Sequence, residues 1–346
     1  MPSAPLSPLY GPSPPYRAPR KVSLKDQCYQ HRFYGPTDQL EDNLATLESH
    51  IAPVLQAIQS DKTLPPSGEN HYEMLLIFVA LQLLRTTAAA ARVNASVDKM
   101  TKQVFSRDTR LEGIDMDSVH FGYDHPVLMS LSTLEFMVSA IADLKAHLVL
   151  ADNGTFITSD NPVFRYDQYC EGAHNVGTTG GLNRGLQLFL PLSPSALLLL
   201  YDGSVYKVGD RTTNLVSTSI QDIERLNMMQ LISAVENVYF SDWKERESIQ
   251  YLAPRAERHR NPDPTRVLEY MSEDNENHSL LHLFEHIPNL KLNLSFLTIR
   301  RNARRLPLYK RLREYRKPLP IPDPPVPPHL RGRMVRYSRP RGSGKA

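Results

Sequence analysis

The chain has 346 residues and a net charge of +3, with 41% hydrophobic and 22% charged residues. This composition is typical of a folded globular protein with a well-buried core. The longest apolar stretch, residues 74–84, is well below the roughly 18 residues of a membrane span, so we expect no span. Cys28 and Cys170 are too few for a disulfide framework, and the first residues lack the apolar run of a secretory signal, which indicates the cytoplasm.

Both ends of the chain differ from its middle. Residues 1–26 are rich in proline and poor in apolar side chains, which predicts a disordered arm. From Arg300 onward there are 15 basic and 2 acidic residues, a net of +13, which leaves 25 basic and 35 acidic residues, a net of −10, in residues 1–299. We therefore predict a single α+β domain at residues 27–299 and a basic, proline-rich tail at 300–346 that the acidic body attracts.

Helical periodicity dominates the first half of the chain. Apolar side chains recur every three or four positions over residues 40–58, behind Thr37 as a cap and with a kink expected at Pro53. A long buried helix is expected over residues 72–93, where Asn70 and Glu73 resemble a capping box.

Two more helices and a set of short strands follow. Residues 95–107 and a segment that Pro126 opens are predicted to be helical. The predicted strands are residues 154–158, 186–192, 196–208 with Asp202 and Gly203 at a hairpin turn, and 238–241. A helix is expected within residues 212–237, and residues 245–299 are mixed. These patterns predict an α+β fold in which helices over residues 37–149 pack on a small, mostly antiparallel sheet.

The segment Thr158-Ser-Asp-Asn-Pro-Val163 carries the first candidate site. Proline cannot extend a strand ladder, so Asp160 and Asn161 are expected where a strand stops. Their oxygens suit a metal or a catalytic water, and they suit equally an Asx-turn that caps the strand.

Arg85 is the second candidate. It lies on the same face of the predicted buried helix as Gln82, so a permanent charge is carried toward the core and needs acceptors, for which Glu48 and Asp160 are candidates. A structural ion pair and an anion-binding or catalytic site explain this pattern equally well. If Glu48 and Asp160 share a metal, Mg²⁺ is the ion that two hard carboxylates favour.

The basic tail is a candidate nucleic-acid interface. Its first ten or so residues contain Arg300, Arg301, Arg304, Arg305, Lys310 and Arg311. Arginine neutralises phosphates, and the tyrosines among these residues can stack on bases. Docking on the acidic body and a solubilising role are the alternatives. The proline-rich residues 318–328 suit a protein partner that binds polyproline.

Two further patterns are weaker. The glycine-rich residues 177–185 could wrap a phosphate, but no Lys-Ser or Lys-Thr pair follows, so we expect a mobile surface loop. The other pattern comprises His278, His282 and His286, which recur every four residues, so a helix would present them together to a metal or to solvent.

A third pattern resembles the serine enzymes that recognise penicillin. Ser96 with Lys99, Ser159-Asp160-Asn161, and Lys207 occur in the order of their three motifs. The third motif lacks its threonine and Ser96 falls within a predicted helix, so this similarity gives little support to an acyl-serine enzyme.

Taken together, several of these segments resemble an uncharacterised family known as domain of unknown function 4238. The resemblance covers residues 27–243 and rests on Cys28-Tyr29, Leu47-Glu48, Gln82 with Arg85, residues 158–163, Pro191-Leu-Ser-Pro194, Asn227 and residues 238–241. Members commonly begin with a His-Tyr-Val-Pro-like segment, which is absent before Cys28 and indicates an inactive relative if that histidine takes part in catalysis. The resemblance carries no established activity.

Two functions follow from these observations. The first is a polar site made by Glu48, Gln82, Arg85, Asp160 and Asn161 for an anionic, nucleic-acid ligand, which becomes a phosphodiester hydrolase if a metal binds. The alternative is a non-catalytic interaction protein in which these residues form a structural network and the tail binds a partner.

Overall fold

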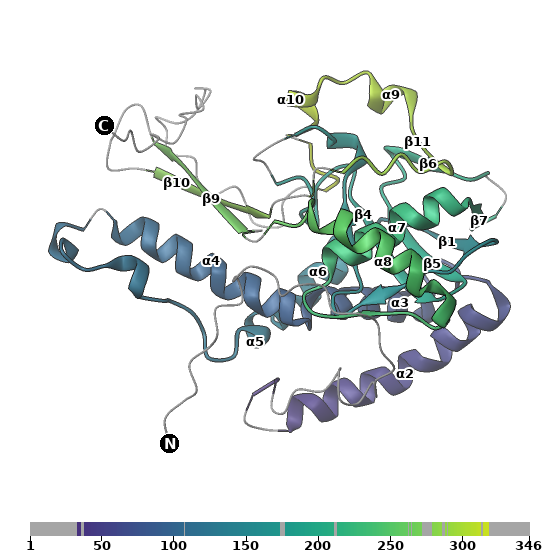
Figure 1. Cartoon of the computed structure of the whole chain (residues 1–346), viewed down its shortest axis with the longest axis horizontal. Helices are drawn as coiled ribbons and strands as arrows, with labels where there is room; N and C mark the ends of the chain where they lie inside the picture. Colours follow the sequence, from purple (N-terminus) through teal and green to yellow (C-terminus); the bar gives the residue numbers. More distant parts are fainter. Residues whose placement is uncertain are drawn as a thin grey trace.

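The computed structural model describes residues 33–35, 38–106, 108–173, 177–210, 213–261, 263, 265–271, 279–285, 288, 290–312 and 314–317. The predicted arm at residues 1–26 and the proline-rich residues 318–328 lie outside these ranges, as do Thr37 and Cys28. Within them the chain folds into helices on both faces of one mixed sheet, with three separate two-stranded ladders outside it (Figure 1).

The longer helices are α2 (Gln39–Asp61), α3 (Asn70–Leu84), α4 (Thr87–Phe105), α5 (Pro126–Leu131), α6 (Leu134–Ile141), α7 (Ile220–Ser233) and α8 (Arg246–Glu257). Two short helices, α9 (Arg301–Arg304) and α10 (Leu308–Arg311), come last, and single 3₁₀ turns include η3 (Gln168–Cys170). The strands are β1 (Lys145–Ala151), β2 (Thr158–Ser159), β3 (Phe164–Tyr166), β4 (Gln187–Ser193), β5 (Ala196–Tyr201), β6 (Tyr206–Val208), β7 (Leu215–Thr218), β8 (Val238–Tyr239), β9 (Thr265–Met271), β10 (Ser279–Glu285) and β11 (Leu297–Ile299).

The main sheet has the strand order β3-β4-β5-β1-β7. All its neighbouring strands are antiparallel except β1 and β7, which are parallel. Every residue of β5 is buried, and its unbroken apolar sequence from Ala196 to Tyr201 is what a strand covered on both faces requires.

Each face of this sheet has its own core. On one face, Leu148, Leu188 and Leu198 pack with the apolar sides of α2, α3 and α6. On the other, Val149, Phe189 and their neighbours pack with α7 and with residues 292–297. The helices cover the sheet as expected of an α+β fold, so the predicted fold class is confirmed.

The sheet is larger than the sequence patterns indicated, because β1 was predicted to belong to a helix. Residues 146–151 are mostly apolar and follow α6 closely, and the buried residues His147, Leu148 and Val149 are consecutive, so no alternation distinguishes this strand from a helix. Strand β7 was also assigned to the following helix; α7 begins only at Ile220, where the Ser219 hydroxyl caps it by accepting from the Asp222 N–H.

The single helix predicted over residues 72–93 is two helices. The chain bends by 58° between α3 and α4. Thr86 caps the new helix, because its side-chain oxygen accepts from the Ala89 N–H. The predicted capping box is wrong, since the cap of α3 is Glu69 and makes no side-chain hydrogen bond. The helix predicted from Pro126 is likewise divided, into α5 and α6.

The hairpin predicted at Asp202 and Gly203 is also wrong. Strand β6 pairs with β11 rather than with β5. The Asp202 carboxylate accepts from the Ser204 and Gly185 N–H groups, so it closes a turn that carries the chain out of the sheet. The hairpin of this region joins β4 to β5 instead.

Strands β9 and β10 form an antiparallel hairpin beside α4, away from the main sheet (Figure 1). His282 lies in β10, whereas His278 and His286 are outside the described residues. Residues 279–285 form a strand, so the helix expected around His282 is not formed there.

Among the described residues, no single helix is long and apolar enough to cross a membrane. The bent pair α3 and α4 meets the criteria of length and composition only when its two helices are taken together. Most of α3 is buried in the core of the protein.

Candidate functional site

Glu48 of α2 and Arg85, at the end of α3, form an ion pair. The Arg85 side chain is 23% exposed and that of Glu48 is 47% exposed, so the pair joins the two helices at the protein surface. Tyr34 lies beside it: burial raises the pKa of this phenol, and the charge of Glu48 adds to the increase while Arg85 opposes it. The guanidinium predicted to need a carboxylate has therefore found Glu48, one of its two expected partners.

Thr86 connects this pair to the second candidate segment. Its hydroxyl lies 3.4 Å from the Asn161 Oδ1 atom. The Asn161 amide donates to the Ser233 backbone oxygen at 3.1 Å and to the Ser233 hydroxyl at 3.0 Å. The helix break at Arg85 and Thr86 is therefore what brings the two predicted clusters next to each other.

The Asp160 carboxylate binds backbone N–H groups that follow α7, and it contacts no basic side chain among the described residues. Its carboxylate accepts from three consecutive N–H groups, of Val235 at 2.8 Å, Glu236 at 2.7 Å and Asn237 at 2.9 Å. Charge-assisted bonds of this kind are among the stronger hydrogen bonds of proteins. Both oxygens of the residue predicted to be catalytic are thus engaged in holding the loop between α7 and β8.

Residues 155–162 are also attached to α7, through two side chains one turn apart. Asn227 accepts from the Ile157 N–H and donates to the Thr155 carbonyl. Gln230 accepts from the Ser159 hydroxyl at 2.9 Å and donates to the Pro162 carbonyl at 2.7 Å. These groups are mostly buried, so the segment that carries the family resemblance has a clear structural purpose here.

Gln82 does not join this network. Its side chain is half-buried and has no hydrogen bond to another described residue. No group of three or more histidine, cysteine, aspartate or glutamate side chains in the described part of the chain is placed to hold a metal ion. Glu48 is paired with Arg85, and Asp160 with backbone donors, so the magnesium site that these two carboxylates would share has no geometric support.

The serine-enzyme motifs are not assembled either. The Ser96 hydroxyl donates to the Arg92 carbonyl within α4, as serine commonly does inside a helix. Lys99 contacts Asp263 and the Thr265 carbonyl rather than Ser96.

The first residues of the basic tail are packed on the body. Arg300 donates to the carbonyls of Gly203 and Tyr206 at 2.9 and 3.0 Å, and Arg311 donates to that of Tyr169 at 2.8 Å. Ala303 is buried in the core. The other four predicted nucleic-acid residues, Arg301, Arg304, Arg305 and Lys310, are exposed.

Arg316 fixes the end of this segment, which we define as the C-terminal strap, residues 300–317. Its side chain is only 3% exposed; it pairs with Asp143 and donates to the carbonyls of Asn183, Ala140 and Gly181. The strap also bonds to residues 182–184 through its backbone, as in the Arg316 N–H to Leu182 carbonyl bond of 2.9 Å. A basic residue expected on a tail is thus a buried structural anchor.

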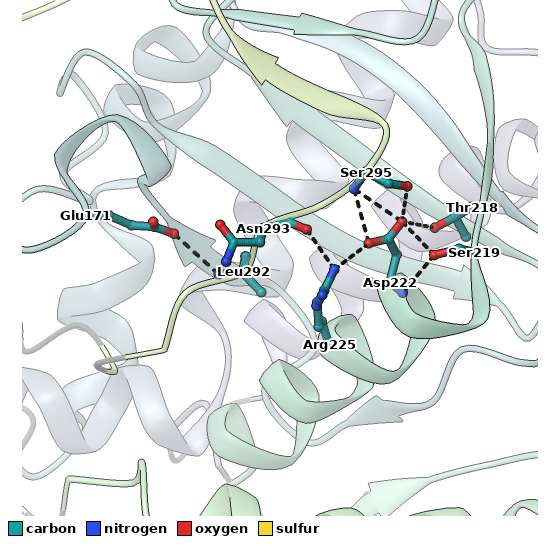
Figure 2. A network of polar contacts seen from close by, with 8 residues as sticks. All are labelled: Glu171, Thr218, Ser219, Asp222, Arg225, Leu292, Asn293 and Ser295. Atoms are coloured by element: carbon teal, nitrogen blue, oxygen red, sulfur yellow. Dashed lines mark hydrogen bonds and ion pairs between the residues drawn. The ribbon is translucent and has the colours of Figure 1, made fainter. Parts of the chain in front are cut away.

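The sequence patterns did not indicate two buried carboxylates, Asp222 and Asp167. Asp222 of α7 is fully buried and accepts from the Ser219 hydroxyl, the Ser295 N–H and Arg225 at 3.0 to 3.2 Å (Figure 2). Burial opposes its ionisation, but the bonds from Ser295 and Ser219 together with the charge of Arg225 lower its pKa. Arg225 also donates to the Asn293 carbonyl at 2.7 Å, so this network fastens residues 293–295 to α7.

Asp167 is the second of these carboxylates. Its Oδ1 atom accepts from the Tyr169 and Cys170 N–H groups at 2.9 and 3.1 Å and from the Tyr206 hydroxyl at 3.2 Å. Its Oδ2 atom has no hydrogen-bond partner among the described residues. Burial therefore outweighs these bonds and raises the pKa of Asp167 to about 7. The spacing Ser219-x-x-Asp222 is a helix-start signal that could have identified the first network; no sequence signal identifies the second.

The comparisons with known proteins give one result. A family model described as protein of unknown function, DUF4238, matches residues 13–244. The chain belongs to this family. The match begins further toward the N-terminus than the expected 27–243, and residues 245–346, including the strap, lie beyond it. No curated protein and no solved structure matches the chain.

Proposed function

We propose that this DUF4238 protein is a non-catalytic nucleic-acid-binding protein, and that its ligand binds the exposed basic face of α9 and α10. The observation that supports the proposal most directly is the division of the strap residues. Arg300, Arg311 and Arg316 are used to hold the strap, whereas Arg301, Arg304, Arg305 and Lys310 face solvent without a described acidic partner.

The four exposed cations have the properties of a phosphate-binding surface. They lie within ten residues, on or directly after two short helices that are fixed to the body, so their spacing is largely set before a ligand arrives. Tyr309 lies among them with 63% of its surface exposed, and an exposed ring next to cations suits stacking on an unpaired base. A polyanion such as single-stranded RNA or DNA matches this combination.

A catalytic function has less support. The hydrolase hypothesis needs Asp160 and Glu48 to be available for a metal, and both make other contacts. We therefore assign binding, and not turnover, to the proposed function.

The test is a comparison of two fourfold variants. In the first, Arg301, Arg304, Arg305 and Lys310 are replaced by Gln. In the control, four exposed basic residues elsewhere are replaced in the same way, namely Arg110, Lys244, Arg255 and Arg258. Both sets of changes remove four positive charges from exposed positions, so the net charge of the two variants is matched, and circular dichroism checks that both are folded.

Binding of labelled single-stranded RNA and DNA is measured by anisotropy over a salt series. Each phosphate contact that is lost reduces the slope of log K against log salt by roughly 0.7, so we expect a reduction of about 2 to 3 for the first variant and little change for the control. The chain ending at Lys317 is measured in parallel, which separates this surface from residues 318–346. Equal slopes for the two variants would contradict the proposal.

One observation favours a second candidate, the non-catalytic protein that binds a protein partner. Of the 14 exposed large hydrophobic side chains of the described residues, 8 lie between Met100 and Phe136, in the part of the fold that includes the end of α4. If neither RNA nor DNA binds the full chain at low salt, this candidate is preferred.

A further inference from the structure

A carboxylate at the end of the β9–β10 hairpin lies between two arginines of the body. The Arg165 guanidinium, on β3, donates to one oxygen of Glu285, and the Arg92 Nε atom, on α4, lies 3.4 Å from the other. The three side chains come from three elements that are far apart in the sequence. The pairing is therefore made by the tertiary fold and not by local structure.

The balance of charge in this cluster favours an anion. The side chains of Arg165 and Arg92 are 18% and 21% exposed, and that of Glu285 is 37% exposed. Partial burial opposes the ionisation of Glu285, but the two guanidinium groups outweigh it and bring its pKa to about 2. Two guanidinium groups from different elements thus converge on one carboxylate, which is how such groups hold an oxyanion by charge-assisted hydrogen bonds.

The glycine-rich segment borders the same cluster. Arg165 donates to the Thr179 carbonyl at 3.4 Å. Phe284, the residue before Glu285, packs on Gly177 so closely that a Cβ atom on this glycine would lie 2.8 Å from the Phe284 Cβ. Thr178 is only 1% exposed, and its hydroxyl has no partner among the described residues. The expectation of a surface loop is therefore wrong for Thr178 and Thr179, which are buried, and the Thr179 carbonyl contacts Arg165.

The described contacts of the hairpin that supplies Glu285 include several charged ones. Besides the two arginines, Lys99 of α4 contacts Asp263 and the Thr265 carbonyl at the start of β9. A two-stranded hairpin is marginally stable by itself, so it depends on such contacts for its position. Ion pairs of partly exposed groups are weak and compete with dissolved anions.

We propose that Arg92 and Arg165 form an oxyanion-binding site, that Glu285 occupies it as an internal ligand, and that a phosphate group is the external ligand that displaces Glu285. Guanidinium forks bind carboxylate and phosphate with the same planar geometry, and a phosphate dianion would match two arginines in charge. This site is separate from the exposed basic residues of α9 and α10, and the proposal does not depend on the proposed function.

The experiment removes the internal ligand without changing its size. Inorganic phosphate is titrated into the full chain and into Glu285→Gln by calorimetry, and acetate is titrated in parallel. We expect Glu285→Gln to bind phosphate at least about tenfold more tightly than the unchanged chain, since one competing carboxylate has been removed. Arg165→Gln in the same background should abolish the gain. Tighter binding of phosphate than of acetate assigns the site to a dianion, and the reverse order assigns it to a carboxylate and overturns the phosphate proposal.

Equal phosphate affinity of the two proteins overturns the proposal, as does a gain that survives Arg165→Gln. If circular dichroism shows that Glu285→Gln is unfolded, the unchanged chain is used instead. Phosphate should then accelerate proteolysis within residues 265–285 by displacing the hairpin, and sodium chloride of equal ionic strength should not. The absence of this difference up to saturating phosphate also overturns the proposal.

Discussion

Asp167 accepts three hydrogen bonds with one oxygen and none from the described residues with the other. A carboxylate in an apolar core needs donors on both oxygens to stay ionised at low cost. The Tyr206 hydroxyl donates to the Gly185 carbonyl as well, at 2.8 Å, so its single proton is shared between that carbonyl and Asp167. The residue thus holds the η3 turn by its ability to accept bonds, and its charge destabilises the fold.

The stability of the protein should therefore fall as the pH rises from about 4 to 7. In the unfolded chain Asp167 ionises near its ordinary pKa, and in the folded chain near 7, so the folded state binds the additional proton between these values. Three pKa units correspond to a loss on the order of 4 kcal/mol. The Asp167→Asn variant keeps the accepting oxygen and loses the charge, so its urea midpoint should change less between pH 5 and pH 8.

The titration of His147 changes the stability of the protein with pH in the opposite direction, so its effect must be separated from that of Asp167. Burial lowers the pKa of its imidazole, so its contribution is lost as the pH falls below the ordinary histidine range. Because His147 is present in both proteins, the difference between them isolates Asp167. The idea is wrong if the two proteins lose stability in parallel between pH 5 and pH 8.

At the scale of elements, Asp160 joins two of them. It connects the end of β2 to the three N–H groups that follow α7. Charged hydrogen bonds of this kind typically contribute about 1.5 to 3 kcal/mol, and unpaired backbone donors cost more when they are buried. Asp160→Ala should therefore lower the free energy of unfolding by about 2 to 3 kcal/mol.

Asp152→Ala is the matched control, because Asp152 is an exposed aspartate a few residues earlier that makes no described hydrogen bond. Chemical denaturation of both variants measures the difference. If the two variants are equally stable, the structural assignment of Asp160 is contradicted, and a ligand-binding one regains support.

Whether the sequence predicted an element depends on whether the local side-chain pattern or a tertiary contact defines that element. Helix α2 and the strand β5 follow from side-chain periodicity and from an unbroken apolar run, so both were predicted. The break at Thr86 was missed because threonine is compatible with a helix interior, and only its bond to Ala89 makes it a cap. Strand β1 was missed because tertiary burial on both faces removes the alternation that identifies a strand.

The candidate site was predicted in part for a similar reason. The sequence identified Arg85 as a charge in need of a partner, and Glu48 is the partner that the structure provides. It could not assign Asp160, because a carboxylate at a strand end has the same sequence signature whether it binds a metal or a backbone loop. Glu285 and Arg165 are 120 residues apart, and no local pattern connects them.

For the whole molecule, the strap completes the fold. Ending the chain at Ile299 would remove buried Ala303 and leave Asp143 without Arg316. Arg316 is buried and Asp143 is partly exposed, so the lost pair together with the other lost contacts of the strap should make this truncated chain unfold at a clearly lower temperature. Ending it at Lys317 keeps every strap contact and should leave the unfolding temperature unchanged.

Differential scanning calorimetry of the three chains provides the measurement. Equal unfolding temperatures for the chains ending at Ile299 and Lys317 would show that the strap contributes little. The result also decides how nucleic-acid binding should be examined. A chain without the strap could lose binding either because the exposed cations are gone or because the protein is unfolded. The chain ending at Lys317 avoids that ambiguity.

The position of β11 and Arg316 has a consequence for synthesis in the cell. Strand β6 pairs with β11, and the sheet face that α7 covers in part receives further cover from residues 290–312. A nascent chain that has completed β1 to β8 therefore carries a sheet face that α7 covers only in part. Closure of this face must wait until residues 290–317 have been made, and until then the emerging chain is a natural client for chaperones that bind exposed apolar surface.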